Sequence, residues 1–288
     1  MATAATLPTT SAVPRQISRK ARRAAWTRRI LIGLAFLLTA LFLLVPVAVI
    51  FQQAFARGVP TFWANITHPE TLHAIWLTVL VALIVVPINA FFGLCAAWAI
   101  AKFQFRGKKL LIALIELPFS ISPIVAGVAY LMVYGSRGIF GPWLEEHGLQ
   151  VMFALPGIVL VTLFVTCPFI ARQVLVLMQS QGVDEEEASL SLGAGGFKTF
   201  LYVTLPNLKW ALIYGVILCN ARAMGEYGAV SVVSGQIRGQ TNTLPLQVDL
   251  LYHDYNAAGA FAAASVLAVL ALITLAVKTI VEIRSRTE

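Results

Sequence analysis

Six long apolar runs dominate the sequence, and the first of them, residues 30–51, contains no charged side chain. A helix that crosses a bilayer needs about 20 mostly apolar residues, so each run is long enough to span a membrane. The other five runs fall at about 72–101, 110–134, 151–179, 208–233 and 257–281. We therefore predict an all-α polytopic membrane protein with six transmembrane helices.

The composition agrees with this prediction and sets the expected domain boundaries. Hydrophobic residues make up 59% of the 288 residues and charged residues only 12%, whereas soluble domains are about 25% charged. The spans and their loops fill nearly the whole chain, which excludes a separate soluble catalytic domain of ordinary size. A secretory signal peptide is the alternative for the first run, but its apolar stretch would be only about 7–15 residues long. We expect an N-terminal tail at 1–29, unstructured over 1–14, a transmembrane domain at 30–281 and a C-terminal tail at 282–288.

The basic residues are distributed unequally between the two sides of this predicted membrane domain. With six spans, the N-terminal tail, the 102–109 and 180–207 loops and the C-terminus share one side. The basic residues of the opposite loops are only Arg57, Arg137 and Arg238. Because cytoplasmic loops carry the excess of Lys and Arg, both termini and both tails are predicted to be cytoplasmic. The net charge of +8 is thus assigned to orientation and to the lipid membrane, and no nucleic-acid partner is expected.

The 180–207 loop contains an unusual cluster of acidic residues, Asp-Glu-Glu-Glu at 184–187. Carboxylates in the first turn of a helix complement its dipole, so a helix is predicted to start at Asp184. A helical stripe with a mostly apolar face follows at Val183, Glu187, Leu190, Ala194 and Phe197. Such a helix could lie on the membrane surface or dock into a groove on a soluble partner, and periodicity does not separate the two.

The same loop resembles a known signature. Glu187-Ala188-Ser189, then Gly193, then Val203-Thr204-Leu205-Pro206 resembles the EAA–x3–G–x9–I–x–LP motif of permease subunits of bacterial ABC importers, with Ser189 and Val203 as mild departures. The resemblance implies an ABC-importer (MetI-like) permease fold, with Gly193 turning between two short helices and Pro206 starting the next helix. It also implies a set of residues that couple to a cytoplasmic ATPase: Glu187, Ala188, Gly193, Leu205 and Pro206.

A weaker similarity, to a phosphate-binding loop, is excluded by spacing. The stretch from Gly193 to Lys198-Thr199 lacks the glycine that must directly precede the lysine, and Phe197 occupies that position. The chain is therefore expected to hold no cofactor of its own, and ATP would be bound by partner subunits.

Charged residues within the predicted spans suggest a second functional region. Arg222 and Glu226 are four residues apart in the fifth run, so they would share a helical face and could pair. A charge near a span centre costs about 2.5–3.5 kcal/mol, so the two would neutralise each other in a packing role or line a path for an anion. Ser120 and Ser122 flank a predicted break between Pro118 and Pro123, where they could solvate an anion or bond back to helix carbonyls.

Further motifs narrow the resemblance. Residues 222–229, Arg-Ala-Met-Gly-Glu-Tyr-Gly-Ala, resemble the RA-x-GE-[FY]-GA segment of oxyanion permeases, and the segments at 117–127 and 241–246 resemble two more patterns of that group. The chain is similar to the W-type permeases of sulfate/thiosulfate importers. This implies a bacterial inner-membrane location, a second permease paralogue, two ATPase subunits and a periplasmic sulfate/thiosulfate-binding protein.

Other functions are less well supported. A molybdate permease and an ATP-independent secondary transporter are the alternatives. His68, His73, His147 and His253 lack metal-ligand spacing, and the three cysteines lie inside apolar runs, so neither a metal site nor a catalytic constellation is expected. The chain is predicted to be a non-catalytic permease subunit.

Overall fold

The computed structural model describes residues 19–285, and all regular structure in that range is helical. The predicted all-α class is thus confirmed. The chain divides into two units, Met1–Val49 and Ile50–Glu288. The prediction that residues 1–14 are unstructured, and the last residues of the predicted C-terminal tail, lie outside the described residues.

The described part of the first unit, from Arg19 on, is one helical path. It contains α1 (Arg19–Thr39), a π-helical turn η1 (Ala40–Leu44) and the start of α2 (Val45–Phe55). The predicted boundary between tail and span at 29/30 therefore falls inside a helix, because Arg, Lys and Ala are good helix formers and nothing in the sequence interrupts the path. The apolar part, Trp26–Phe55, is long enough to cross a membrane, and its most apolar stretch has no residue buried within the structure.

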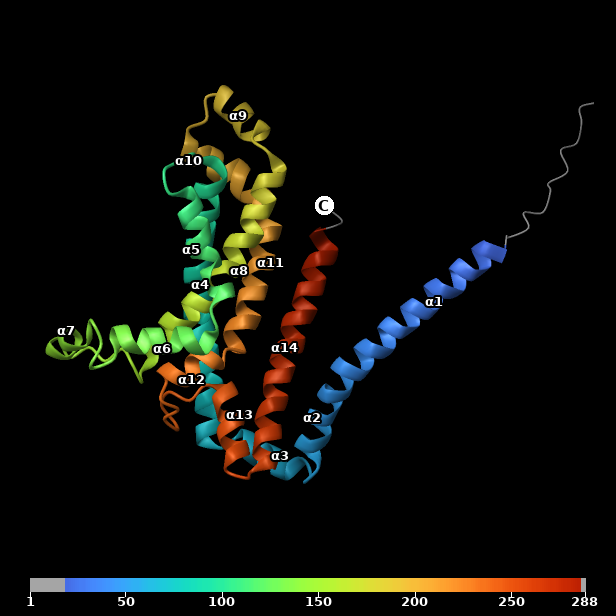
Figure 1. The fold of residues 1–288 in the computed structure, drawn as a ribbon, viewed down its shortest axis with the longest axis vertical. Coiled ribbons are helices and arrows are strands. Elements are labelled where there is room, and N and C mark those ends of the chain that lie inside the picture. The colour runs from blue at the N-terminus through green and yellow to red at the C-terminus, as the bar shows by residue number, and fades with distance from the viewer. Residues whose placement is uncertain (1–18, 286–288) are drawn as a thin grey trace, which may run out of the picture. The chain divides into compact units, whose positions relative to one another are not determined.

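Three long helices form the centre of the second unit: α4 (Pro69–Lys102), α8 (Leu155–Gln181) and α11 (Leu205–Met224). Figure 1 shows them side by side. Two glycines allow this close packing, because a Cβ on Gly93 would lie 2.9 Å from the Ala171 nitrogen and one on Gly215 would lie 3.1 Å from the Ile170 Cα. Small residues at helix contacts let backbones approach closely in membranes.

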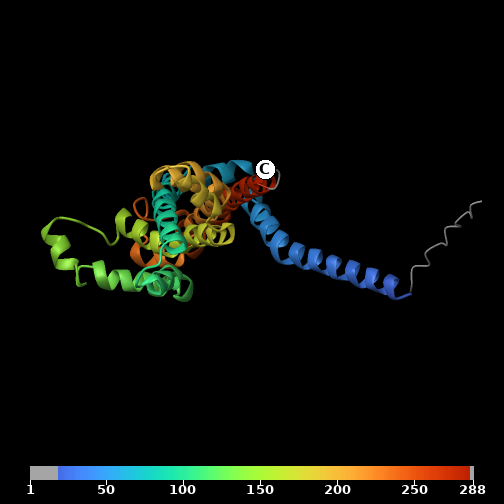
Figure 2. The same ribbon diagram turned by 90° about the horizontal axis from the view of Figure 1, so that it is seen from above.

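The predicted third span is broken. Its two halves, α5 (Lys108–Ser120) and α6 (Pro123–Tyr134), are bent by 112° at the Ile121-Ser122 linker, as the prolines on either side predict. The described residues contain five helices long and apolar enough to span, or six if this bent pair is one span. Figures 1 and 2 show α6 and the short α7 (Gly141–Glu146) directed away from the three central helices.

The predicted fifth span, 208–233, is wrong at both ends. The helical path starts at Gly196, through α10 (Gly196–Thr199) and a π-helical turn η2 (Phe200–Thr204), and α11 ends at Met224. Gly225 ends α11, and residues up to 233 form a separate helix, α12 (Gly228–Val233). Glycine weakens a helix interior and favours a stop, a signal that the hydropathy pattern hides.

The described part of the second unit contains four further helices. They are α3 (Val59–Ile66), α9 (Asp184–Ser191), α13 (Leu244–His253) and α14 (Ala257–Ser285). In Figure 1, α9 and α10 lie at one end of the central helices, and α3, α12 and α13 lie at the other. The helix α14 runs back from the α13 end, and its last residues extend past the predicted span limit of 281.

Candidate functional site

The first candidate region is a helical hairpin, residues 183–206, which we call the coupling hairpin. Its first helix, α9, starts at Asp184 with four carboxylates in the first turn, as the sequence predicts. The chain then turns at Gly193, whose φ of +86° is a left-handed conformation that favours glycine. The turn leads into α10, so Gly193 does lie between two short helices.

The other predicted coupling residues lie along this hairpin. Glu187 and Ala188 are exposed on α9, Leu205 is half-buried and Pro206 is exposed in the first turn of α11. Pro206 occupies one of the first positions of α11, as predicted, although the helical path runs into α11 without a break from Gly196. The π-helical turn that precedes it widens the helix where a proline ring would otherwise clash with the preceding turn.

The predicted apolar stripe is also divided by the turn. Because α9 ends at Ser191, Ala194 and Phe197 belong to the second half of the hairpin. Large apolar side chains on both sides of the turn are exposed: Leu192, directly after α9, is 88% exposed, and Phe197 and Tyr202 of the second half are 76% and 74% exposed. A group of exposed apolar side chains next to charged ones is typical of a protein-binding surface.

The four carboxylates of α9 have different surroundings. Glu186 accepts a hydrogen bond from the Thr204 hydroxyl at 2.7 Å and forms an ion pair with Lys102 at the end of α4. Glu185 accepts a hydrogen bond from the Asn207 amide. Glu187 is exposed and has no side-chain partner among the residues that the structure describes. Two carboxylates thus hold the hairpin in place, and Glu187 is available for another molecule.

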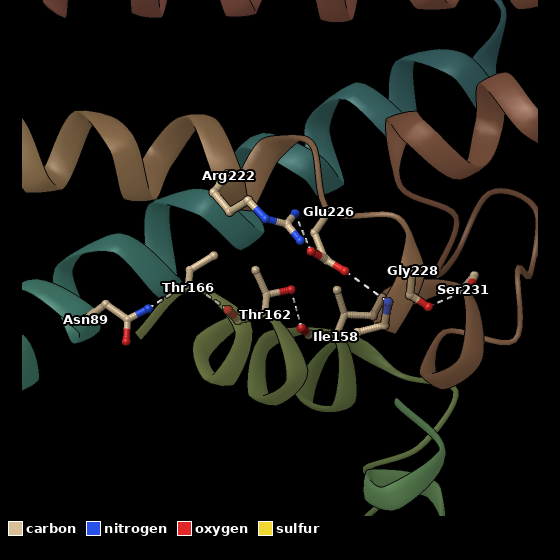
Figure 3. A network of polar contacts seen from close by, with 9 residues as sticks. Asn89, Ile158, Thr162, Thr166, Arg222, Glu226, Gly228 and Ser231 are labelled. Atoms are coloured by element: carbon tan, nitrogen blue, oxygen red, sulfur yellow. Dashed lines mark hydrogen bonds and ion pairs between the residues drawn. The ribbon is translucent and has the colours of Figure 1, made fainter. Parts of the chain in front are cut away.

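The second candidate region is the Arg222–Glu226 pair, which forms as predicted although the helical reason given for it is wrong. Arg222 lies in the last turn of α11, and Glu226 lies in the connection to α12. Figure 3 shows the guanidinium directed at one carboxylate oxygen. The other oxygen accepts a hydrogen bond from the Ala229 backbone N–H at 2.9 Å, so Glu226 also stabilises the start of α12.

The burial of the two partners is unequal. The Glu226 side chain is 1% exposed and the Arg222 side chain is 33% exposed. A buried carboxylate needs a close counter-charge, and Arg222 provides it. Arg222 therefore compensates the buried carboxylate, and the partly exposed side of its guanidinium is open to a further contact.

The break between α5 and α6 lies close to this pair. Ser120 and Ser122 are both exposed, and neither hydroxyl has a protein partner among the described residues, so they do not bond back to their own helices. A Cβ on Gly228 would lie 3.2 Å from the Pro123 Cβ, and one on Gly127 would lie 2.8 Å from the Ala229 carbonyl oxygen. Glycine at both positions thus brings the broken span against the segment that carries Glu226.

One set of buried hydrogen bonds between two central helices was not predicted from the sequence. Asn89 of α4 is buried and donates hydrogen bonds to the Thr166 hydroxyl (2.8 Å) and the Leu163 carbonyl (3.3 Å) of α8 (Figure 3). A single amide within an apolar run was the available signal, since polar side chains in spans usually bond to neighbouring helices.

The cysteines and the possible metal-ligating side chains are the remaining candidates. Within residues 19–285 there is no group of three or more His, Cys, Asp or Glu side chains that could hold a metal ion. All three cysteines are free thiols.

Comparison with known proteins identifies the family. Residues 89–287 match the family described as binding-protein-dependent transport system inner membrane component. The chain belongs to this family of transporter permeases. It is 53% identical over 264 residues to the sulfate transport system permease protein CysW of Escherichia coli K12, covering 92% of this chain and 91% of that protein. It is 32% identical over 244 residues to CysT of the same organism, covering 85% and 88%.

A solved structure confirms the fold of the permease. One chain of a bacterial alginate ABC transporter, crystallised with a pentasaccharide-bound periplasmic protein, matches with a TM-score of 0.75 at 16% identity, covering 91% of this chain and 96% of that one. The predicted ABC-importer permease fold, inner-membrane location and non-catalytic permease class are thereby confirmed. The similarity to both CysW and CysT supports a permease heterodimer in an ABC system.

Proposed function

We propose that this permease carries sulfate and thiosulfate across the inner membrane, in a complex with a second permease paralogue, two ATPase subunits and a periplasmic binding protein. The observation that carries the proposal is the 53% identity to a sulfate permease over 92% of the chain. Here the RAMGEYGA segment and the broken span, the two parts that resemble oxyanion permeases, lie against each other.

The coupling hairpin is the contact with the ATPase. Glu187 and Ala188 on α9, with the apolar side chains of Leu192 and Phe197, form the surface that enters a cleft of the ATPase subunit. Gly193 sets the angle between the two halves, and Leu205 and Pro206 join them to α11. ATP is bound by the partner subunits. When those subunits close, the spans move relative to one another as rigid bodies.

The orientation of the permease follows from its charges. The hairpin lies at the same end of the second unit as the 102–109 loop, which carries Lys102, Arg106, Lys108 and Lys109, and α14 ends toward it. We assign this end and both termini to the cytoplasm. The end with α3, α12 and α13 then faces the periplasmic binding protein.

The anion path includes Arg222, with Ser120 and Ser122 as neutral donors at the helix break. Donors of this kind can replace part of the hydration of a divalent anion without adding a full unpaired charge to the membrane. Glu226 holds Arg222 in position and keeps the net charge of the region low.

Reconstitution tests the proposal. The chain is purified with its co-expressed partners, incorporated into vesicles and supplied with the binding protein, and anion-stimulated ATP hydrolysis is compared for sulfate, thiosulfate and molybdate. Stimulation by sulfate and thiosulfate supports the proposal. Stimulation by molybdate alone would assign another oxyanion, and uptake by the isolated chain without ATP would identify a secondary transporter.

A further inference from the structure

The end of α4 is attached to the coupling hairpin by charged contacts that the resemblance does not assign. The ammonium of Lys102, the last residue of α4, lies 2.7 Å from a Glu186 carboxylate oxygen and donates a hydrogen bond to the Gly182 carbonyl at 2.9 Å. The other Glu186 oxygen accepts the hydrogen bond from Thr204. One lysine therefore joins the ends of α4 and α8 to the first turn of α9 and, through Glu186, to η2.

The position of this contact favours a stable pair. The side chains of Lys102 and Glu186 are 13% and 19% exposed, so water screens them less than an ordinary surface pair. The cation lies at the C-terminal ends of α4 and α8, and the carboxylate lies at the N-terminus of α9, each at the helix end whose dipole favours its charge. Thr204, the third member, is buried.

The same helix has polar attachments at two further levels. Asn89, near its middle, bonds to Thr166 of α8, and the hydroxyl of Thr78, near its other end, accepts a hydrogen bond from the Leu244 N–H at the start of α13, at 2.8 Å. From Thr78 to Lys102 a helix rises about 36 Å, more than the roughly 30 Å of the hydrocarbon core. The helix α4 thus connects the hairpin, the membrane core and the segment at the opposite end.

We propose that the Lys102–Glu186 pair is a positioning joint that transmits displacement of the coupling hairpin into α4 and, through α4, to α8 and α13. This inference rests on the proposed function, since it requires a partner that moves α9. Lys102 does not contact the ATPase in this scheme; it makes α9 and α4 move together. Without the pair, α9 is connected to α4 only indirectly, through the packing of α8 and α11, so less of its displacement reaches α4 and ATP hydrolysis would continue with less transport.

The test compares sulfate taken up per ATP hydrolysed in vesicles that contain the complete transporter. The variants are Lys102→Met, Glu186→Gln and the charge swap Lys102→Glu/Glu186→Lys. Lys109→Met is the matched control, because Lys109 is an exposed cation of the same loop region without a partner among the described residues. Each single variant is expected to lower the ratio about tenfold, within the usual range of coupling between sites, and the control is expected to keep it.

The charge swap distinguishes a joint from a general loss of stability. If the pair itself transmits the movement, the swap recovers most of the lost transport per ATP at an equal amount of assembled complex. A wild-type ratio in Lys102→Met, or a swap as poorly coupled as the single variants, overturns the inference. If the wild-type complex shows no sulfate-stimulated hydrolysis, the proposed function fails instead.

A crosslink provides a second test that does not depend on removing the pair. With Lys102→Cys/Glu186→Cys in a background without the native cysteines, a bifunctional thiol reagent with a reducible spacer would fix α9 to α4, since the two long side chains meet only at their ends. If α9 and α4 move together during transport, the crosslink replaces the lost ion pair. The crosslinked transporter is then expected to take up as much sulfate per ATP as the wild type, and to lose this coupling when the crosslink is reduced. A transporter that is inactive when crosslinked and active when reduced would show that the two helices must separate, and would overturn the inference.

Discussion

Removing Arg222 should destabilise the permease far more than removing both members of its ion pair. The Glu226 side chain is 1% exposed and keeps only the hydrogen bond from Ala229 when the guanidinium is absent. An uncompensated buried charge of this kind costs about 3–5 kcal/mol. In Arg222→Ala/Glu226→Gln the charge is gone and the amide oxygen still accepts from Ala229, so the cost should fall to about 1 kcal/mol.

Thermal unfolding of the purified complex measures this difference. At about 2–4 °C per kcal/mol for a chain of this size, Arg222→Ala should lower the midpoint by about 10 °C and the double variant by only a few degrees. Arg238→Ala is the control, because its pair with Asp254 is 47% and 41% exposed and should contribute at most about 1 kcal/mol. A double variant as unstable as Arg222→Ala would refute the argument from the buried carboxylate.

The same variants separate packing from a role in the anion path. The double variant is expected to be stable yet to lose sulfate selectivity, because Arg222 supplies the positive potential beside the helix break. Stable protein with unchanged uptake and selectivity would show that the pair only holds α11 and α12 together.

Three further predictions concern single positions. Glu187→Lys should leave the complex in the membrane but abolish stimulated uptake, since Glu187 is exposed and free to contact the ATPase; normal uptake would remove it from the coupling surface. Gly193→Ala places a Cβ at a φ of +86°, which costs about 1–2 kcal/mol, and should lower stimulated ATP hydrolysis, whereas Gly195→Ala, at an ordinary φ, should change little. Gly93→Ala puts a methyl group 2.9 Å from the α8 backbone and should lower the unfolding midpoint, while Gly33→Ala, with open space around it, should not.

The all-α class and the helix that starts at Asp184 could be predicted from the sequence, because each depends on local pattern. Hydropathy identifies a span without knowledge of its neighbours, and the acids at 184–187 mark a helix start through the local dipole. Boundaries were less well predicted, since the end of α11 at Met224 depends on Gly225 and on the packing of α12 against α6. Hydropathy alone reads residues 208–233 as one run.

Contacts between distant residues could not be predicted from pattern at all. Lys102 and Glu186 are far apart in the chain, and each has an adequate local explanation, as a topology signal and as a helix-start acid. Only the fold places the end of α4 against α9. The Arg222–Glu226 pair was predicted correctly, but from the wrong backbone geometry. The helix that was expected to align the two side chains ends at Met224, two residues before Glu226. A buried charge requires a partner whatever the local backbone, so the electrostatic requirement was a safer guide than the helical geometry.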